Sequence, residues 1–227
     1  MFARQDIWSN GVAQYTTAKH PEHKWDYLPV VAETYDGFLN DIQGRHVHYP
    51  DVEAALDAAH DGPVEEGNVG GGTGMVCFRF KCGIGTSSRQ LPASEGGYKI
   101  GVLVQANFGS REQLTVDGVP VGRELTDYVP PSEGKDGSIV VVIGTDAPVS
   151  SVRTTGAHRP PSRFGPGTYG KPLFRATVEA TEEGILNALT MGKTMQGVDG
   201  HVAYQLPYDR LAAMMAKYGR PLAPASH

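Results

Sequence analysis

The chain has 227 residues, the length of one large domain or two small ones, and is long enough to bury a sizeable core. Gly (29) and Pro (16) make up about a fifth of the residues and the apolar fraction is 40%, which predicts a loop-rich globular protein. The net charge of −5, without a basic block, argues against nucleic-acid binding, and the apolar runs are too short to span a bilayer.

The first residues, MFARQDIWSN, lack the apolar segment of a signal peptide, so the sequence predicts a cytoplasmic protein. The cysteines, Cys77 and Cys82, are too few for a disulfide framework, and their spacing is not that of a zinc site. We interpret them as reduced thiols in or near a strand.

The N-terminal third predicts little regular structure. Residues 1–27 are polar and aperiodic and offer no core face, whereas the apolar run 28–32 could be a short buried strand. Residues 48–62 predict a helix that has Pro50 in its first turn and is stopped by Gly62-Pro63. Its expected inward face consists of Val52, Ala55, Leu56 and Ala59.

The middle of the chain predicts strands. Residues 75–80 and 98–106 are interpreted as strands, and Asp117-Gly118 as the type I′ turn of a hairpin. Residues 139–143 are a β-branched run of the kind expected of a strand covered on both faces.

The C-terminal part begins with an atypical loop, residues 150–170, which has no acidic residue and no apolar period. A long helix is predicted next, followed by a short helix within 207–219 that is ended by Gly219. Strands mixed with helices and hairpin signals favour a layered α+β domain. The apolar stripe of the long helix is expected to be Phe174, Val178, Ile185 and Leu189.

Several polar or glycine-rich features do not match the sequence pattern of a phosphate-binding loop or a metal site. The loop GNVGGGTG (67–74, with Glu66 before it) leads into a strand rather than a helix, so it matches neither phosphate-binding pattern, and we expect tight turns and close backbone packing there. His46 and His48 lack a third metal ligand at a telling spacing and are interpreted as solvated, as is the pair Glu182-Glu183.

Ser138, in KDGSIVVVIGTDAP, allows two interpretations. No G-x-S-x-G elbow surrounds it, and a Gly-Ser turn before a buried strand is common. If the Gly137–Ser138 bond were cut, however, Ser138 would carry a hydroxyl beside an α-amine, whose pKa near 8 suits a base at neutral pH. The residues alone leave both interpretations open.

A set of longer motifs resembles the DmpA/BapA family of self-processing aminopeptidases, the L-aminopeptidase/D-esterase and β-peptidyl aminopeptidase group. The motifs follow the family's order and are LPVVAETYDGFLNDI (28–42), EGNVGGGTGMVCFRFKCGIGTSSR (66–89), IGVLVQANFG (100–109), GVPVGR (118–123), GSIVVVIGTDAP (137–148), PLFRATVEATEEGILNAL (172–189) and LPYDRL (206–211). The resemblance implies an αββα layered fold like that of N-terminal-nucleophile hydrolases. It also implies a single domain over 1–227, in which 28–137 belong to the larger chain and 138–227 form a shortened smaller chain.

The resemblance implies roles for particular residues. Gly137–Ser138 corresponds to the site of self-cleavage, with Ser138 as the nucleophile, and Asn107 corresponds to the amide of the oxyanion hole. Tyr35 corresponds to an active-site tyrosine that hydrogen-bonds near the reaction centre.

Two further residues would bind the substrate. Glu33 corresponds to the carboxylate that binds its free ammonium, and Trp25 to a pocket-lining tryptophan, although one extra residue separates Trp25 from Glu33 here. The implied function is removal of the N-terminal residue from short peptides, amides or esters, with no cofactor, metal, nucleic acid or membrane, by a chain that forms homo-oligomers.

The sequence also departs from the family. Fewer residues precede the first motif, and the interval 150–170 stands where the family has a helix and a strand segment with a supporting serine and acid. This favours an alternative, a shortened and catalytically impaired homologue. A third hypothesis, an acyltransferase like the ornithine acetyltransferases, is disfavoured by serine rather than threonine at position 138 and by the motifs ETYDG and GNVGGGTG.

Overall fold

The computed structural model describes residues 2–23, 31–125, 138–146 and 170–222. The helices are α1 (Phe2–Lys19), α2 (Tyr49–Asp57), α3 (Val121–Glu124), α4 (Gly170–Thr190) and α5 (Tyr208–Lys217). The strands are β1 (Val76–Cys77), β2 (Phe80–Lys81), β3 (Ile84–Gln90), β4 (Lys99–Asn107), β5 (Ser138–Thr145), β6 (Met195–Gln196) and β7 (Val202–Ala203).

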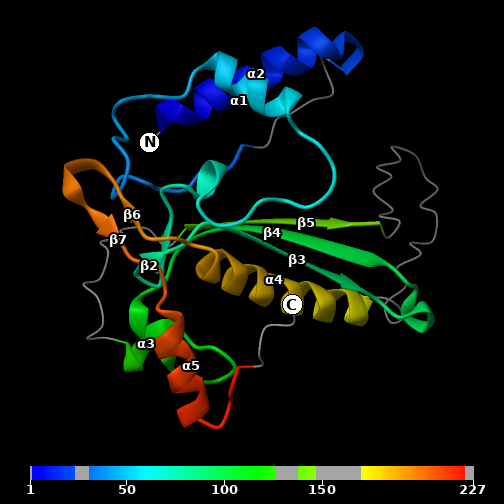
Figure 1. Ribbon diagram of the computed structural model, residues 1–227. Helices are drawn as coiled ribbons and strands as arrows, with labels where there is room; N and C mark the ends of the chain where they lie inside the picture. Colours follow the sequence, from blue (N-terminus) through cyan, green and yellow to red (C-terminus); the bar gives the residue numbers. More distant parts are fainter. Residues whose placement is uncertain (1, 24–30, 126–137, 147–169, 223–227) are drawn as a thin grey trace.

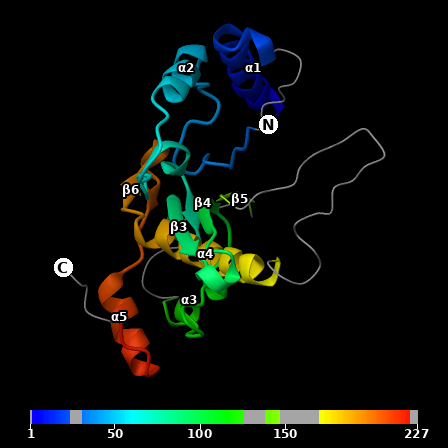
Figure 2. The same cartoon turned by 90° about the vertical axis from the view of Figure 1, so that its right-hand side faces the viewer.

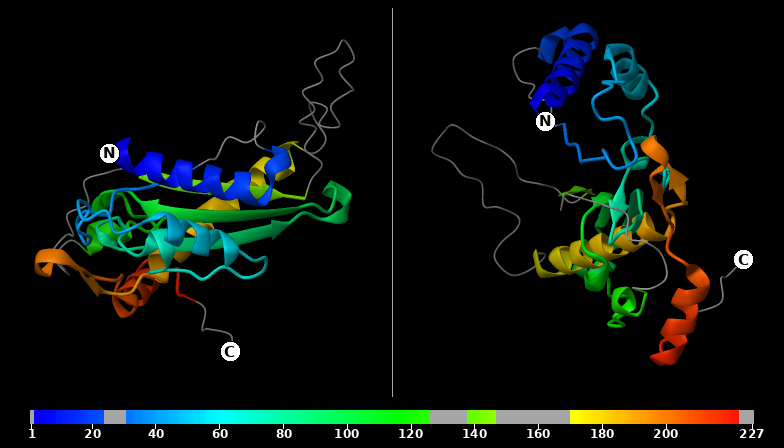
Figure 3. Two further views of the ribbon diagram at one scale, coloured as in Figure 1. Left: turned by 90° about the horizontal axis from the view of Figure 1, so that it is seen from above. Right: turned by 90° about the vertical axis from the view of Figure 1, so that its left-hand side faces the viewer.

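The centre of the molecule is an antiparallel sheet with the strand order β3-β4-β5 (Figure 1). Helix α4 lies along one face of this sheet, and α1 and α2 lie on its other side, as Figures 2 and 3 show. Helices on both sides of an antiparallel sheet confirm the predicted α+β class. Among the described residues, every helix is too short or too polar to cross a membrane.

Strand β4 confirms the strand predicted at 98–106 and separates the two faces of the sheet. Every second side chain joins the main core under α4, whereas Leu103 and Gln105 lie on the other face and are half-buried. The residues facing α4 are Ile100, Val102, Val104 and Ala106.

Helix α4 packs on the sheet through small residues, so the predicted stripe is partly wrong. Phe174 and Val178 are 74% and 66% exposed, although Leu189 is buried as expected. At Gly85 of β3, a Cβ would come within 2.1 Å of the Gly184 carbonyl oxygen, so the helix and the strand are in backbone contact. Such a close approach selects small side chains, and the buried positions of α4 include Ala176, Ala180, Gly184 and Ala188.

Strand β5 contains the predicted run 139–143, but the expected cover on both faces is wrong. Val142 is 58% exposed and Ile143 is 51% exposed. Within the described residues, β5 pairs only with β4, and α4 lies over β3 and β4 instead.

The N-terminal residues form helix α1, which the sequence did not predict. Its contact with α2 is made by close approach and polar groups: buried Gly11 lies against Val52, and the Tyr15 hydroxyl donates to Asp57 over 2.6 Å. No apolar stripe is needed for such a contact. The predicted strand at 28–32 is wrong for residues 31 and 32, which are irregular, and its other residues lie outside the described ranges.

Residues 76–81 form a hairpin rather than the single strand predicted over 75–80. Strands β1 and β2 are joined by Phe78 and Arg79, both with positive φ (49° and 62°). Cys77 and Cys82 form a disulfide across this hairpin, so the prediction of reduced thiols is wrong. A turn of two non-glycine residues in the left-handed region carries no ordinary sequence signal.

The remaining predicted elements agree better with the structure. Helix α2 begins at Tyr49 with Pro50 in its first turn, but it ends at Asp57, before the predicted stop at Gly62-Pro63, and only Val52 of its predicted face is buried. Helix α5 is followed by Gly219 at a φ of 71°, as predicted. The Asp117-Gly118 turn is also confirmed, with positive φ at both residues, but its strands reduce to one bridge between Val116 and Val119.

Candidate active site

Asn107, the last residue of β4, has an oriented and buried side-chain amide. The backbone N–H of Val76 donates to Asn107 Oδ1 over 3.1 Å, and Asn107 Nδ2 donates to the Tyr35 carbonyl oxygen over 2.6 Å. Because Oδ1 has to face the N–H donor, the two bonds define which end of the amide is which. One N–H of Asn107 is therefore bonded to Tyr35, and the second N–H also has a defined direction because the amide is oriented.

Ser138 and Asn107 are cross-strand partners, because the register of β4 and β5 pairs them directly. For Ser138 only the backbone is described, and Gly137 and Trp25 lie outside the described residues. The structure thus brings the backbone of Ser138 to Asn107, and Asn107 to Tyr35.

Tyr35 is oriented by a neighbouring glycine. A Cβ at Gly37 would lie 2.5 Å from the Tyr35 hydroxyl, so the phenol ring lies over this glycine. The chain then turns at Asp36, whose carbonyl oxygen accepts from the backbone N–H groups of Leu39 and Asn40. The missing Cβ of Gly37 therefore leaves the space that the tyrosine ring occupies.

A cavity of about 700 Å³ opens beside this cluster. Among its described lining residues are Glu33, from the loop that carries Tyr35, and Gln105, from β4. Tyr35 and Asn107 themselves are not among them. The remaining described lining residues are Val31, Ala32, Thr34, Asp36, Asn40, Arg45, His46, Val47, Asp51, Ala55, Gly70, Gly71, Thr73, Gly74 and Met75.

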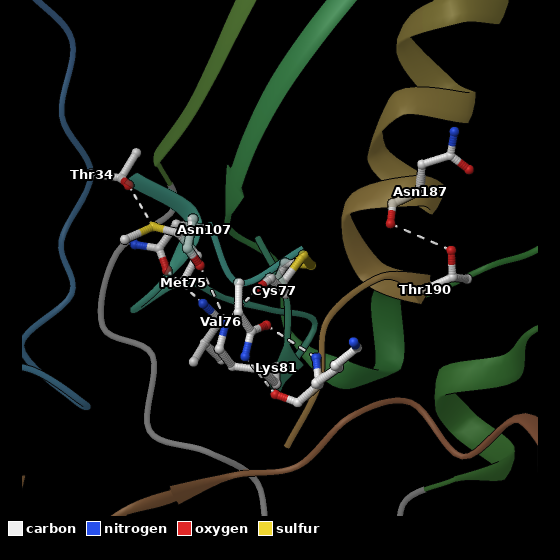
Figure 4. The surroundings of a disulfide bond; sticks show 12 residues. Thr34, Met75, Val76, Cys77, Lys81, Asn107, Asn187 and Thr190 are labelled. Carbon is white, nitrogen blue, oxygen red and sulfur yellow. Dashed lines mark hydrogen bonds between the residues drawn. A yellow bond between two sulfur atoms is a disulfide. The ribbon is translucent and has the colours of Figure 1, made fainter. Parts of the chain in front are cut away.

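Three cavity residues that the sequence did not single out are bonded to one another. Gln105 Nε2 donates to Thr34 Oγ1 over 2.8 Å, and the Thr34 hydroxyl donates to Met75 Sδ. Figure 4 shows Thr34 and Met75 close to Asn107, beside the Cys77–Cys82 disulfide. The alternation of a strand could have indicated Gln105, because residues two apart on β4 share a face and Gln105 lies two residues before Asn107.

The glycine loop provides tight turns and close contacts, as predicted. Gly67 and Gly70 have positive φ (80° and 48°), and a Cβ at Gly67 would lie 2.2 Å from the Met191 carbonyl oxygen. Lys81 is fully buried beneath this loop, where its ammonium donates to the carbonyl oxygens of Gly72 and Cys82. Burial lowers the pKa of Lys81 to about 8.

The other polar candidates lie at the surface. His46 and His48 are exposed and His46 Nε2 lies 3.4 Å from Asp41, while the described residues contain no cluster of metal-ligating side chains. Glu182 and Glu183 are exposed as predicted. A hydrogen bond from Arg89 holds the pKa of Glu183 below its ordinary value.

The family assignment rests on a match that spans most of the chain. The model of Peptidase family S58 matches residues 5–156. The chain belongs to this family. The match includes most of α1, so the family resemblance begins well before the first motif recognised in the sequence.

Individual relatives agree with the assignment to family S58. The chain is 38% identical over 252 residues to the β-peptidyl aminopeptidase BapA of Sphingosinicella microcystinivorans, covering 87% of this chain and 64% of that protein. With BapA of Sphingosinicella xenopeptidilytica it is 39% identical over 239 residues, covering 83% and 60%. The chain thus spans less than two thirds of the length of these relatives.

Among solved structures, the L-aminopeptidase D-Ala-esterase/amidase of Ochrobactrum anthropi superposes with a TM-score of 0.80 at 31% identity, covering 95% of this chain and 71% of that one. That structure is described as a prototype for the serine aminopeptidases and as a new variant among the Ntn hydrolase fold. The likeness confirms the fold class predicted from the sequence.

Proposed function

We propose that this chain is an autoprocessing serine aminopeptidase that removes the N-terminal residue from short peptides, amides or esters. The observation that carries the proposal is the direct pairing of Ser138 with Asn107 in a member of family S58. The pairing supports a nucleophile and an oriented amide donor acting on the same carbonyl group.

The first proposed step is self-cleavage. The Ser138 hydroxyl attacks the Gly137 carbonyl carbon and the acyl group moves from the Ser138 nitrogen to its oxygen. Water then hydrolyses the ester, which leaves a carboxylate on Gly137 and a hydroxyl and α-amine on Ser138. An α-amine ordinarily has a pKa of about 8, so the new amine can act as the base for its own hydroxyl at neutral pH.

The second proposed step is hydrolysis of the substrate. The α-amine takes the hydroxyl proton while Ser138 attacks the substrate carbonyl, and the N–H of Asn107 that does not bond Tyr35 donates to the developing oxyanion. Collapse of the intermediate then breaks the bond to the leaving amine or alcohol, which departs with the proton from the α-ammonium. A single donor of this kind typically changes kcat by about 10²–10³-fold. Water resolves the acyl-enzyme and releases the N-terminal residue.

Substrate selection is assigned to Glu33. Its position in the cavity supports recognition of a free ammonium, which would restrict the enzyme to N-terminal residues. Tyr35, held over Gly37, is proposed to hydrogen-bond near the reaction centre, and Trp25 to line the pocket. A homo-oligomeric state and a cytoplasmic location stay predictions.

Intact-mass measurement of purified protein tests the proposal. We expect two fragments, one ending at Gly137 and one beginning at Ser138, whereas Ser138→Ala stays whole. A wild-type chain that stays whole and releases no amino acid from short peptides would contradict the proposal and leave the catalytically impaired homologue as the better description.

A further inference from the structure

The segment that carries Glu33 and Tyr35, residues 31–37, is here called the cavity loop. It contains no helix or strand, and residues 31–35 form no backbone–backbone hydrogen bond with other described residues. The position of residues 31–35 therefore depends on side-chain contacts, whereas the Asp36 carbonyl oxygen is bonded to the backbone N–H groups of Leu39 and Asn40.

Two amides on the same face of β4 make such contacts with consecutive residues of the loop. Gln105 Nε2 donates to the Thr34 hydroxyl over 2.8 Å, and Asn107 Nδ2 donates to the Tyr35 carbonyl oxygen over 2.6 Å. Residues two apart on a strand point to the same face and are spaced by about 7 Å. The side-chain hydroxyl of Thr34 and the backbone carbonyl oxygen of Tyr35 are the two groups that these amides reach. The alternation of β4 thus presents two donors to one segment.

The glycine loop confines Gln105 from its other side. A Cβ at Gly71 would lie 2.0 Å from Gln105 Oε1, so the amide lies directly against the backbone of this glycine. The Thr34 hydroxyl, which accepts from Gln105, donates in turn to Met75 Sδ at the end of the same loop. Gln105 is therefore held between the glycine loop and the cavity loop.

We propose that Gln105 is a positioning residue, which holds the cavity loop through Thr34 so that Glu33 faces the ammonium group of the substrate. The role given to Glu33 rests on the proposed aminopeptidase function, whereas the hydrogen bond between Gln105 and Thr34 does not depend on it. Gln105 touches neither Ser138 nor Asn107 in any described hydrogen bond, so its loss should affect substrate binding more than the chemical step.

The test compares Thr34→Val and Gln105→Leu, which remove the acceptor and the donor of the same hydrogen bond while nearly keeping side-chain volume. Each variant is expected to raise KM for a short peptide by about 3- to 10-fold with kcat within about 2-fold of wild type, as loss of one hydrogen bond predicts. The double variant should resemble Thr34→Val, because that single change already removes the Gln105–Thr34 hydrogen bond, together with the bond to Met75 Sδ. When either change is combined with Glu33→Gln, KM should rise no further than it does in Glu33→Gln alone.

Thr181→Val on α4 is the matched control, since it removes a hydroxyl that bonds only within the helix, to the Thr177 carbonyl oxygen. It should leave KM unchanged. A fall in kcat at unchanged KM, or additive effects in the double variant, would overturn the assignment of Gln105.

Hydrogen exchange tests the contact between Gln105 and Thr34 independently of enzyme activity. The peptide covering residues 31–37 should exchange faster in Thr34→Val than in wild type or Thr181→Val. If the wild type hydrolyses nothing and yet this difference appears, the proposed function fails and the positioning contact stands. If exchange is the same in all three proteins, the proposed contact is wrong whatever the activity.

Discussion

Lys81 predicts an unusual dependence of stability on pH. Its side chain is fully buried and its pKa is lowered from 10.5 to about 8 because burial disfavours the charged form. In the unfolded chain the lysine regains its ordinary value. Below pH 8 both states are protonated, so the folded state carries the full cost of the buried charge.

Between pH 8 and 10.5 the unfolded chain binds a proton that the folded chain has released, so the free energy of unfolding rises with pH. The separation of the two pKa values corresponds to about 3 kcal/mol, because each pH unit contributes 1.36 kcal/mol. This rise is opposite in sign to the contribution of a lysine that gains an acidic partner on folding.

Denaturant titrations of wild type and Lys81→Met, at intervals from pH 7 to 10.5, measure the effect. The difference between the two proteins isolates Lys81 because the other groups titrate in both, and we expect it to change by about 2–3 kcal/mol in favour of wild type as pH rises. Lys99→Met, at an exposed position of β4, is the control and should follow wild type. Parallel curves for wild type and Lys81→Met would refute the reasoning.

Two further predictions concern packing and the hairpin. Gly85→Ala should lower the free energy of unfolding by about 1–3 kcal/mol, because a Cβ there would meet the backbone of α4 at 2.1 Å. Gly101→Ala on β4, with open space around it, is the control. Equal effects of the two changes in thermal unfolding would contradict this account of α4 packing. Reduction of the Cys77–Cys82 disulfide should lower the free energy of unfolding by only about 2 kcal/mol, because the bond closes a short loop. Denaturant titration with and without dithiothreitol measures the change, and a double Cys→Ser variant should not respond to the reductant.

The elements that the sequence predicted well are those whose pattern is local. Strand β4 alternates apolar and other residues along its length, and α5 has an apolar face followed by a glycine. The family motifs placed Asn107, Tyr35 and Ser138 in one site, and the structure joins them through a hydrogen bond and a strand register.

The elements that the sequence missed depend on contacts between distant segments. Helix α1 lacks an apolar period and packs through Gly11, and the turn at Phe78 and Arg79 lacks the usual turn residues. Phe174 of α4 is apolar but exposed, because the close approach of the helix to β3 selects small side chains at the contact. Gln105 was missed because its partner, Thr34, lies 71 residues away.

The alternation of β4 connects stability with the candidate site. On one face its side chains pack under α4, and its Val104 is the cross-strand partner of Gly85 on β3, where a Cβ would meet the α4 backbone. This close packing fixes the strand, and therefore also fixes the amides of Gln105 and Asn107 on the opposite face. Because each amide bonds to the cavity loop, a displacement of α4 would reach Glu33 and Tyr35 through the strand. Under the proposed function, a packing variant such as Gly85→Ala should thus raise KM for a short peptide as well as lower stability, even though it lies on β3, outside the cavity.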